Sequence, residues 1–285
     1  MNPVRIRLVI AFDGTRYQGW QTQKSGQGVQ ELIEIALRKL FPQAGPVHGS
    51  SRTDAGVHAL GLVAHVEIPR DQWRLSARKL VLALNAHLPE DIRILTSQRA
   101  RADFHARFHA SGKEYRYRIW NAPAMNPLLN RFAWHVPRPL DVAAMRQAAA
   151  HFVGRHDFAS FTSNPGYLRP DTVRTLQRCR VLRRGPEITI LIEGDGFLYK
   201  MCRGIAGTLV QVGLHRITPA EIPEILRLKD RRVAGMTAPP EGLVLWRVHY
   251  RKRSALTESS TSDARQSNPG DGSNPESPPT ILSGL

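Results

Sequence analysis

The residues best suited to chemistry lie in one short segment, Gly49 to Ala59, which reads G-S-S-R-T-D-A-G-V-H-A. Asp54 stands among small and hydroxylated residues, with Arg52 two positions before it and Gly56 two positions after it. Gly56 lets the backbone turn, and Arg52 could bind a phosphate or stabilise the charged form of a nearby carboxylate. An isolated Arg-x-Asp-x-Gly is more often an ordinary turn with a solvated arginine, so the triplet alone assigns no function.

This segment joins two regular elements in the first half of the chain. Apolar residues alternate along Val4–Phe12, His58–Ile68 and Ile92–Thr96, which predicts three strands. Val29–Phe41 and Ser76–His87 have the apolar spacing of helices. The expected order is therefore strand, helix, strand, helix, strand. A loop held between rigid elements is the usual position of catalytic residues.

The second half repeats this theme with more hairpins. Tyr115, Tyr117 and Ile119 alternate with charged residues, which predicts a strand with one polar face. Thr218-Pro219-Ala220-Glu221 has the pattern of a capping box and predicts the start of a helix. The other expected elements are a helix over Asp141–Phe152, a hairpin of Thr172–Leu182 with Glu187–Glu193, a helix over Tyr199–Val212 and a strand over Leu243–Tyr250. The mixture predicts an α+β fold with two antiparallel sheets backed by helices.

Composition narrows the class of protein. The chain has 285 residues, with 40 Lys and Arg against 24 Asp and Glu, a net charge of +16 that suits a nucleic-acid partner. Two cysteines, Cys179 and Cys202, are too few for a disulfide framework or a cysteine-rich zinc site. No apolar run approaches the roughly 20 residues of a membrane span, and the first residues lack the apolar stretch of a secretory signal. A cytoplasmic protein without membrane contact is expected.

The last part of the chain differs in composition from the rest. Residues 254–285 are rich in Ser, Pro and Gly and carry four acidic residues and one arginine, so the excess positive charge belongs to the residues before them. Without apolar periodicity this segment is expected to be disordered. The expected organisation is an N-terminal α+β domain over 1–104, a C-terminal α+β domain over 105–250 and a disordered tail over 251–285.

The whole loop, rather than its triplet, resembles the signature G-R-T-D-x-G-V-H of the tRNA pseudouridine synthases of the TruA family. Ser50 and Ser51 replace the more usual Ala-Gly before Arg52. Four further blocks resemble the family in its own order: Phe12–Gln21, Asp103–Phe108 with Tyr115–Tyr117, Phe197–Arg203 and Ala238–Leu243. The resemblance covers residues 4–250 and leaves out the tail.

The resemblance implies a fold, a reaction and a partner. The fold would be two RRM-like or ferredoxin-like halves with a catalytic cleft between them. The reaction would be the isomerisation of uridine to pseudouridine in the anticodon stem-loop of tRNA, at positions 38, 39 and 40. The target base must leave its stack before its bonds can be reached. The reaction implies no metal and no organic cofactor, and the family's enzymes are homodimers that hold a tRNA.

The same resemblance assigns four site residues. Asp54 matches the catalytic carboxylate, which acts on the sugar or on the base. Tyr115 matches the tyrosine that stacks on the target base, although a tyrosine on an alternating strand could equally be a core residue. Arg203 matches the arginine that pairs with the catalytic carboxylate. Arg52 matches the arginine linked to base flipping, where a guanidinium can fill the vacated space or bind phosphate.

The sequence leaves two alternatives to a pseudouridine synthase. A non-catalytic RNA-binding module with RRM-like sheets would suit the charge and the strand tyrosines, but the chain lacks an RNP1-type run. A tRNA-modifying enzyme of different chemistry would need a methyl-donor or metal site. The spacing of His48, His58 and His65 predicts no zinc site, and His105 and His109 lack an intervening Glu. Cys202 is expected to pack rather than to act as a nucleophile.

Overall fold

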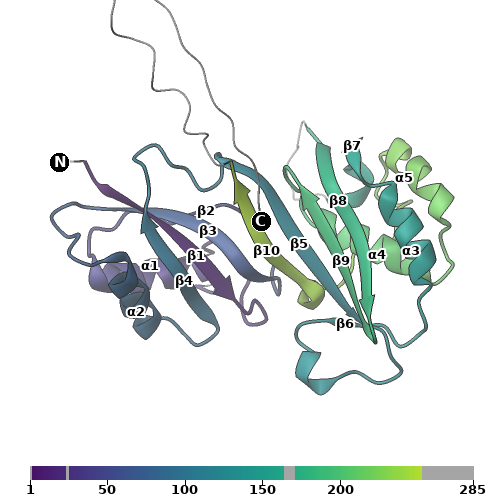
Figure 1. Cartoon of the computed structure of the whole chain (residues 1–285), viewed down its shortest axis with the longest axis horizontal. Helices are drawn as coiled ribbons and strands as arrows, with labels where there is room; N and C mark the ends of the chain where they lie inside the picture. Colours follow the sequence, from purple (N-terminus) through teal and green to yellow (C-terminus); the bar gives the residue numbers. More distant parts are fainter. Residues whose placement is uncertain (1, 24–25, 164–170, 252–285) are drawn as a thin grey trace, which may run out of the picture. The chain divides into compact units, whose positions relative to one another are not determined.

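The computed structural model describes residues 2–23, 26–163 and 171–251 (Figure 1). These residues belong to one compact unit that ends at Arg251. The tail expected over 251–285 therefore lies, apart from Arg251, outside the described residues. Within the described part, no helix is long and apolar enough to cross a membrane.

The structure confirms an α+β class, with a ten-stranded and mostly antiparallel sheet. Eight strands follow one another in the order β4-β1-β3-β10-β5-β9-β8-β7, while β2 pairs with β3 and β6 pairs with β5. The strands are β1 (Val4–Phe12), β2 (His48–Gly49), β3 (His58–Ile68), β4 (Ile92–Arg99), β5 (Ala110–Trp120), β6 (Trp134–His135), β7 (Gly154–Asp157), β8 (Val173–Arg184), β9 (Glu187–Gly194) and β10 (Leu243–Tyr250).

The expectation of two separate sheets is wrong, because the last strand joins them. β10 pairs in parallel with β3 through Val244 beside His58 and Leu245 beside Ala59, and it pairs antiparallel with β5 on its other side. The parallel register matters for the site. It places the start of β3, just after the Asp54 loop, next to the start of β10.

Helices cover the sheet in two groups (Figure 1). α2 packs on β4 and on α1, whereas α4 packs on β5, and α3 packs on β8 and α4. The helices are α1 (Val29–Leu40), α2 (Ala77–His87), α3 (Val142–Ala150), α4 (Met201–Gly213) and α5 (Ile222–Leu228). Ser76 and Asp141 cap the starts of α2 and α3 by accepting hydrogen bonds from the backbone, as short polar side chains do at helix N-termini.

One face of the sheet carries an apolar row across both halves. Phe12, Ala59, Leu245, Tyr115 and Ile192 are successive cross-strand neighbours, and all five are buried. Directly opposed residues share a face, so this row lies on the side of the sheet where the core forms.

The expected capping box is also present, since the Thr218 N–H donates to the Glu221 carboxylate at 2.6 Å. The chain there begins with a 3₁₀ turn over Pro219–Glu221 before α5.

Candidate active site

The Asp54 loop lies between β2 and β3, and the turn that follows β1 supports it. The Trp20 N–H donates to the Thr53 carbonyl at 3.3 Å, and the Gly56 N–H donates to the Tyr17 carbonyl at 3.2 Å. Two backbone hydrogen bonds therefore fix the loop on either side of Asp54. The turn belongs to Phe12–Gln21, the first block of sequence that resembles the TruA family.

Two glycines make this close approach possible. Gly19 has φ +92°, and a Cβ there would lie 2.3 Å from the Thr53 carbonyl oxygen. Gly56 has φ +76°, and a Cβ there would lie 2.9 Å from the ring of Pro240. A side chain at either position would meet both a steric clash and a left-handed backbone. The loop conformation therefore depends on glycine at both places.

Asp54 forms an ion pair with Arg203, which lies near the start of α4. The Nη1 of Arg203 donates to Oδ2 of Asp54 at 3.0 Å, although 149 residues separate them in the sequence. The two side chains are 18% and 12% exposed, for the aspartate and the arginine respectively. Such a sheltered pair is less screened than a surface pair. The carboxylate is thus held in place and still reachable from solvent.

A short segment from Ala238 to Gly242 connects both sides of this ion pair. The Nε of Arg203 donates to the Ala238 carbonyl at 2.8 Å, and the hydroxyl of Tyr117 donates to the Pro239 carbonyl at 2.7 Å. On the side of the Asp54 loop, Nε2 of His58 lies 3.2 Å from the Glu241 carbonyl. The segment is therefore hydrogen-bonded to α4, to β5 and to His58, the first residue of β3.

His58 has further contacts through its other ring nitrogen. The Gly14 N–H donates to its Nδ1 at 2.9 Å. Burial lowers the pKa of His58 against the opposing effect of Asp13, whose Oδ1 lies 3.1 Å from Nδ1. His58 thus joins the turn after β1 to the Ala238–Gly242 segment.

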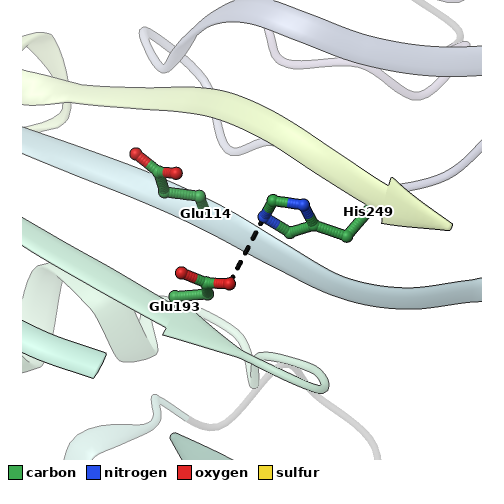
Figure 2. A group of neighbouring side chains, drawn as sticks. All are labelled: Glu114, Glu193 and His249. Atoms are coloured by element: carbon green, nitrogen blue, oxygen red, sulfur yellow. Dashed lines mark ion pairs between the residues drawn. The ribbon is translucent and has the colours of Figure 1, made fainter. Parts of the chain in front are cut away.

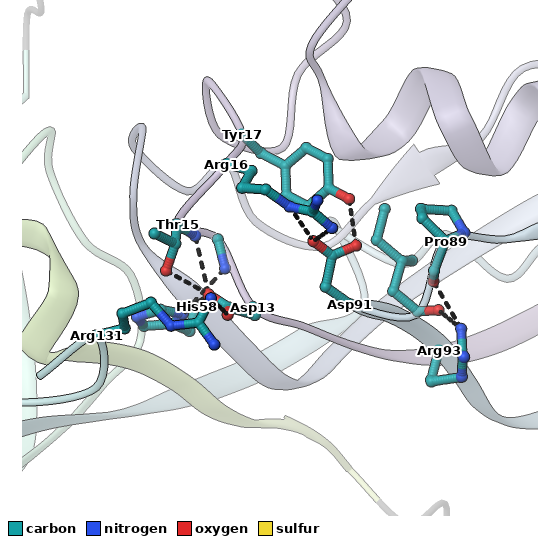
Figure 3. Close-up of polar contacts among 11 residues, drawn as sticks. Asp13, Thr15, Arg16, Tyr17, His58, Pro89, Asp91, Arg93 and Arg131 are labelled. Atoms are coloured by element: carbon teal, nitrogen blue, oxygen red, sulfur yellow. Dashed lines mark hydrogen bonds and ion pairs between the residues drawn. The ribbon is translucent and has the colours of Figure 1, made fainter. Parts of the chain in front are cut away.

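Figure 3 shows the polar contacts around that turn. Asp13 accepts hydrogen bonds from the backbone and hydroxyl of Thr15, and Asp91 accepts them from Arg16 and from the hydroxyl of Tyr17. A hollow of about 440 Å³ opens here, lined by Asp13, Arg16, Glu90, Asp91 and Arg131. Three of these five residues are acidic, so the hollow is poorly suited to a phosphate. Its contacts stabilise the turn that carries the Asp54 loop.

Tyr115 lies on β5, on the apolar face of the sheet, and its ring meets Phe197 edge to face at 5.0 Å between centroids. Burial raises the pKa of its phenol, and the proximity of Cys202 and Asp54 raises it further. The structure therefore brings Tyr115 and Arg203 into the neighbourhood of Asp54. The phenol stays protonated near neutral pH.

Arg52 is placed differently from Arg203. Its side chain is exposed, and no ion pair or hydrogen bond joins it to another residue in the part of the chain that the structure describes. Arg203, not Arg52, is the cation that pairs with Asp54. The hydroxyls of Ser51 and Thr53, on the same loop, are buried. The side chain of Ser51 faces the phenol of Tyr115, whose pKa it lowers against the larger effect of burial.

Another group of three residues has side-chain atoms that could bind a metal ion. Glu114, Glu193 and His249 offer ligand atoms within 4.8 Å of one another (Figure 2). Arg116 donates to Glu114 at 2.7 Å and Arg178 pairs with Glu193, so arginines already neutralise both carboxylates. The geometry indicates an ion-pair network on the polar face of the sheet rather than a cation site.

The histidines and cysteines are arranged for packing. His48, His65 and His105 lie far apart in the sequence, yet their rings meet at 4.7 to 5.9 Å between centroids. This clustering is absent from the sequence prediction, because β2 and β3 pair only in the folded chain. Burial raises the pKa of the Cys202 thiol well above its usual value, which suits a packing residue.

Sequence reasoning missed the residues that support the loop. Tyr117, His58 and Gly19 act through backbone carbonyls, which leave no side-chain pattern to recognise. The sequence offers one signal for this support, the block Ala238–Leu243, which resembles the family but indicates no structural role by itself. In the folded chain this block lies between Arg203 and the Asp54 loop.

Comparison with known proteins identifies the family. A family model described as tRNA pseudouridine synthase matches residues 8–109 and 148–251. Curated relatives named tRNA pseudouridine synthase A include those of Brevibacillus brevis, 47% identical over 250 residues, and Acetivibrio thermocellus, 44% identical over 249 residues. Each alignment covers 86% of this chain and 99% of the relative. The relative from Geobacillus kaustophilus is 45% identical over 248 residues, with 86% and 94% covered.

These matches extend across the described fold and include both partners of the ion pair. They argue against the alternative that the chain is a non-catalytic RNA-binding module. The chain belongs to the tRNA pseudouridine synthase family and is an isomerase that makes pseudouridine in tRNA.

Proposed function

We propose that this enzyme isomerises uridine to pseudouridine in the anticodon stem-loop of tRNA, at positions 38, 39 and 40, with Asp54 as the catalytic residue. The observation that carries the proposal is the ion pair between Asp54 and Arg203, which joins the signature loop to α4 across 149 residues. An arginine held by the Ala238 carbonyl fixes the carboxylate without covering it. This is the arrangement that a positioned catalytic carboxylate requires.

The reaction exchanges one bond of the base for another. The bond between C1′ of the ribose and N1 of uracil breaks, the base turns, and C1′ bonds to C5 of the same base. N1 gains a proton and C5 loses one, so no atom and no electron is left over. The carboxylate of Asp54 acts on the sugar or on the base during these steps. The target nucleotide must be flipped out of its stack to reach it.

Tyr115 provides the surface on which the flipped base rests. Its ring is held edge to face by Phe197, and stacking on a fixed aromatic ring orients a base without reading its sequence. A tyrosine phenol is protonated near neutral pH, and burial raises the pKa of Tyr115 further. It can therefore donate a hydrogen bond to the base.

Arg52 contacts the RNA strand during flipping. Its side chain is exposed and unpaired within the described residues, two positions from Asp54. A free guanidinium beside the site can bind phosphate in a bidentate manner or occupy the space that the base leaves. We assign Arg52 this role rather than any contact with the carboxylate.

We also propose that residues 1–104 and 105–250 are two RRM-like halves that flank a catalytic cleft. The junction of β3 and β10 supports this division, since the Asp54 loop and the Ala238–Gly242 segment meet there. We further propose that the enzyme is a cytoplasmic homodimer and that its basic surface binds tRNA. The net charge of +16 supports RNA binding.

The test is to incubate the purified enzyme with unmodified tRNA and to map pseudouridine at single-base resolution. A matched transcript with cytidine at positions 38, 39 and 40 serves as the control. We expect pseudouridine at these positions in the first transcript and none in the second. Pseudouridine that appears only outside the anticodon stem-loop would contradict the assignment of the target.

A further inference from the structure

One cation near the proposed stacking ring has no acidic partner. Arg116 pairs with Glu114, and Arg203 pairs with Asp54. In the described part of the chain, by contrast, no ion pair or hydrogen bond involves the ammonium of Lys113. Lys113 is also half-buried, which makes an unpaired charge costly.

Lys113 lies on the same face of β5 as Tyr115. The two residues are two positions apart on one strand, so they share a face and lie about 7 Å apart along it. The cross-strand neighbours of Lys113 are Val248 and Gly194, neither of which can neutralise a charge. Cys202 on α4 lies close enough to act on the pKa of both Lys113 and Tyr115. Lys113 therefore belongs to the surroundings of the proposed stacking ring.

The electrostatic surroundings of Lys113 favour an anion. Burial, together with the positive charge of Arg107, lowers its pKa to about 8. A half-buried cation without an acidic partner is stabilised when a negative group binds to it. A lysine supplies a compact point charge that suits a phosphate.

We propose that Lys113 binds one backbone phosphate of the tRNA strand that carries the target uridine, close to the base that stacks on Tyr115. This inference rests on the proposed function, because it takes Tyr115 as the position of the base. The spacing of about 7 Å along β5 places Lys113 within the reach of a phosphate next to that base. Lys113 is a binding residue and acts on affinity rather than on the chemical step.

The test measures binding of the full chain to tRNA that already contains pseudouridine, so that no turnover is needed. The variants are Lys113→Met, which keeps the stem and removes the charge, and Lys113→Arg, which keeps the charge. Lys229→Met is the matched control, because Lys229 already pairs with Asp157 at 3.0 Å. The dissociation constant is measured against salt concentration for each variant. Thermal melting shows that each variant is folded.

We expect Lys113→Met to weaken binding about tenfold, the scale of one charge-assisted hydrogen bond. The slope of log affinity against log salt should fall by about 0.7, the value for one phosphate contact on a single strand. Lys113→Arg should restore the slope, and Lys229→Met should leave it unchanged.

A pH series adds a signature that a structural role would not produce. Affinity should fall as the pH rises through about 8, where Lys113 loses its proton, and the fall should be absent in Lys113→Arg. The facing groups do not titrate in this range, since burial raises the pKa values of both Cys202 and Tyr115 and Arg107 stays charged.

Several results would overturn the proposal. One is a salt slope for Lys113→Met equal to that of Lys229→Met, and another is a loss of kcat at unchanged affinity. A failure of the proposed function is distinguishable, because product tRNA binds without any role for Asp54 in catalysis or any choice of target position.

Discussion

Replacing Tyr117 with Phe tests the claim that the Ala238–Gly242 segment holds the site together. The side chain of Tyr117 is fully buried, and its hydroxyl donates to the Pro239 carbonyl at 2.7 Å. Burial raises the pKa of the phenol well above its usual value, so the proton that it donates is present at every working pH. Phenylalanine keeps the ring and its edge-to-face contact with Trp134. The change therefore removes one hydrogen bond and little else.

The expected loss of stability follows from that single bond. A hydrogen bond contributes about 0.5–1.5 kcal/mol, and a carbonyl left without a partner costs about 1–3 kcal/mol when it is buried. Pro239 is half-buried, so we expect Tyr117→Phe to lower the free energy of unfolding by about 1–2 kcal/mol. At about 2–4 °C per kcal/mol for a chain of this size, Tm should fall by about 2–8 °C.

The assay is urea unfolding and thermal melting beside single-turnover modification of tRNA. Tyr199→Phe is the matched control, because no hydrogen bond of its hydroxyl is found among the described residues and Lys200 only covers its ring. We expect a loss of turnover for Tyr117→Phe, since Ala238 holds Arg203 next to Pro239. If Tyr117→Phe had the same stability and rate as Tyr199→Phe, the hydrogen bond to Pro239 would not hold the site together.

Three further predictions follow from individual groups. Tyr115→Phe keeps the stacking ring, so tRNA affinity should persist in a binding assay, and a rate loss larger than about tenfold would give the hydroxyl a chemical role. Burial lowers the pKa of His65 to about 4, and its Nδ1 accepts the Ala106 N–H at 3.2 Å. Because the unfolded chain binds the proton more readily, stability present above pH 6.5 should be lost as the pH falls toward 4, by up to about 3 kcal/mol. Urea unfolding should show a flatter pH dependence for His65→Phe, and an unchanged slope would contradict this account. A chain that ends at Arg253 should fold and modify tRNA at close to the full rate, with slightly higher affinity at low salt, because the removed segment is acidic and the family match ends at residue 251. Melting temperature and single-turnover rate test this, and aggregation or loss of activity would mean that the tail packs on the fold.

Local structure could be predicted from the sequence wherever a pattern is strict. The strands His58–Ile68 and Leu243–Tyr250 have the bounds that alternation predicts, and the helix Val29–Leu40 ends one residue early. The sequence does not predict the short strands β2 and β6, because two residues are too few to show the alternation of a strand.

The joining of the sheet could not be predicted in the same way. β3 and β10 pair in parallel through two residues each, and nothing in either segment encodes a partner about 185 residues away. The β strands of the two halves satisfy their own patterns whether or not this contact forms. Strand order therefore depends on the tertiary structure.

The same holds for the site, whose separate segments can be recognised in the sequence although their contacts cannot. The Asp54 loop was recognisable as a segment, and Arg203 as part of another, but only folding brings them to 3.0 Å. Asp54 was separable from an ordinary turn residue through family resemblance, not through spacing. Lys113 gave no signal at all, because its lack of a partner is a property of the folded chain.

We propose that the carboxylate of Asp54 catalyses the isomerisation of uridine in tRNA. Single-turnover modification of unmodified tRNA by Asp54→Asn tests this role directly, with enzyme in excess so that binding does not limit the rate. Asp71→Asn, which removes one negative charge at an exposed turn, is the matched control. We predict no pseudouridine from Asp54→Asn although tRNA remains bound, and a normal rate from Asp71→Asn. A rate for Asp54→Asn within about tenfold of the unchanged enzyme would contradict the assignment.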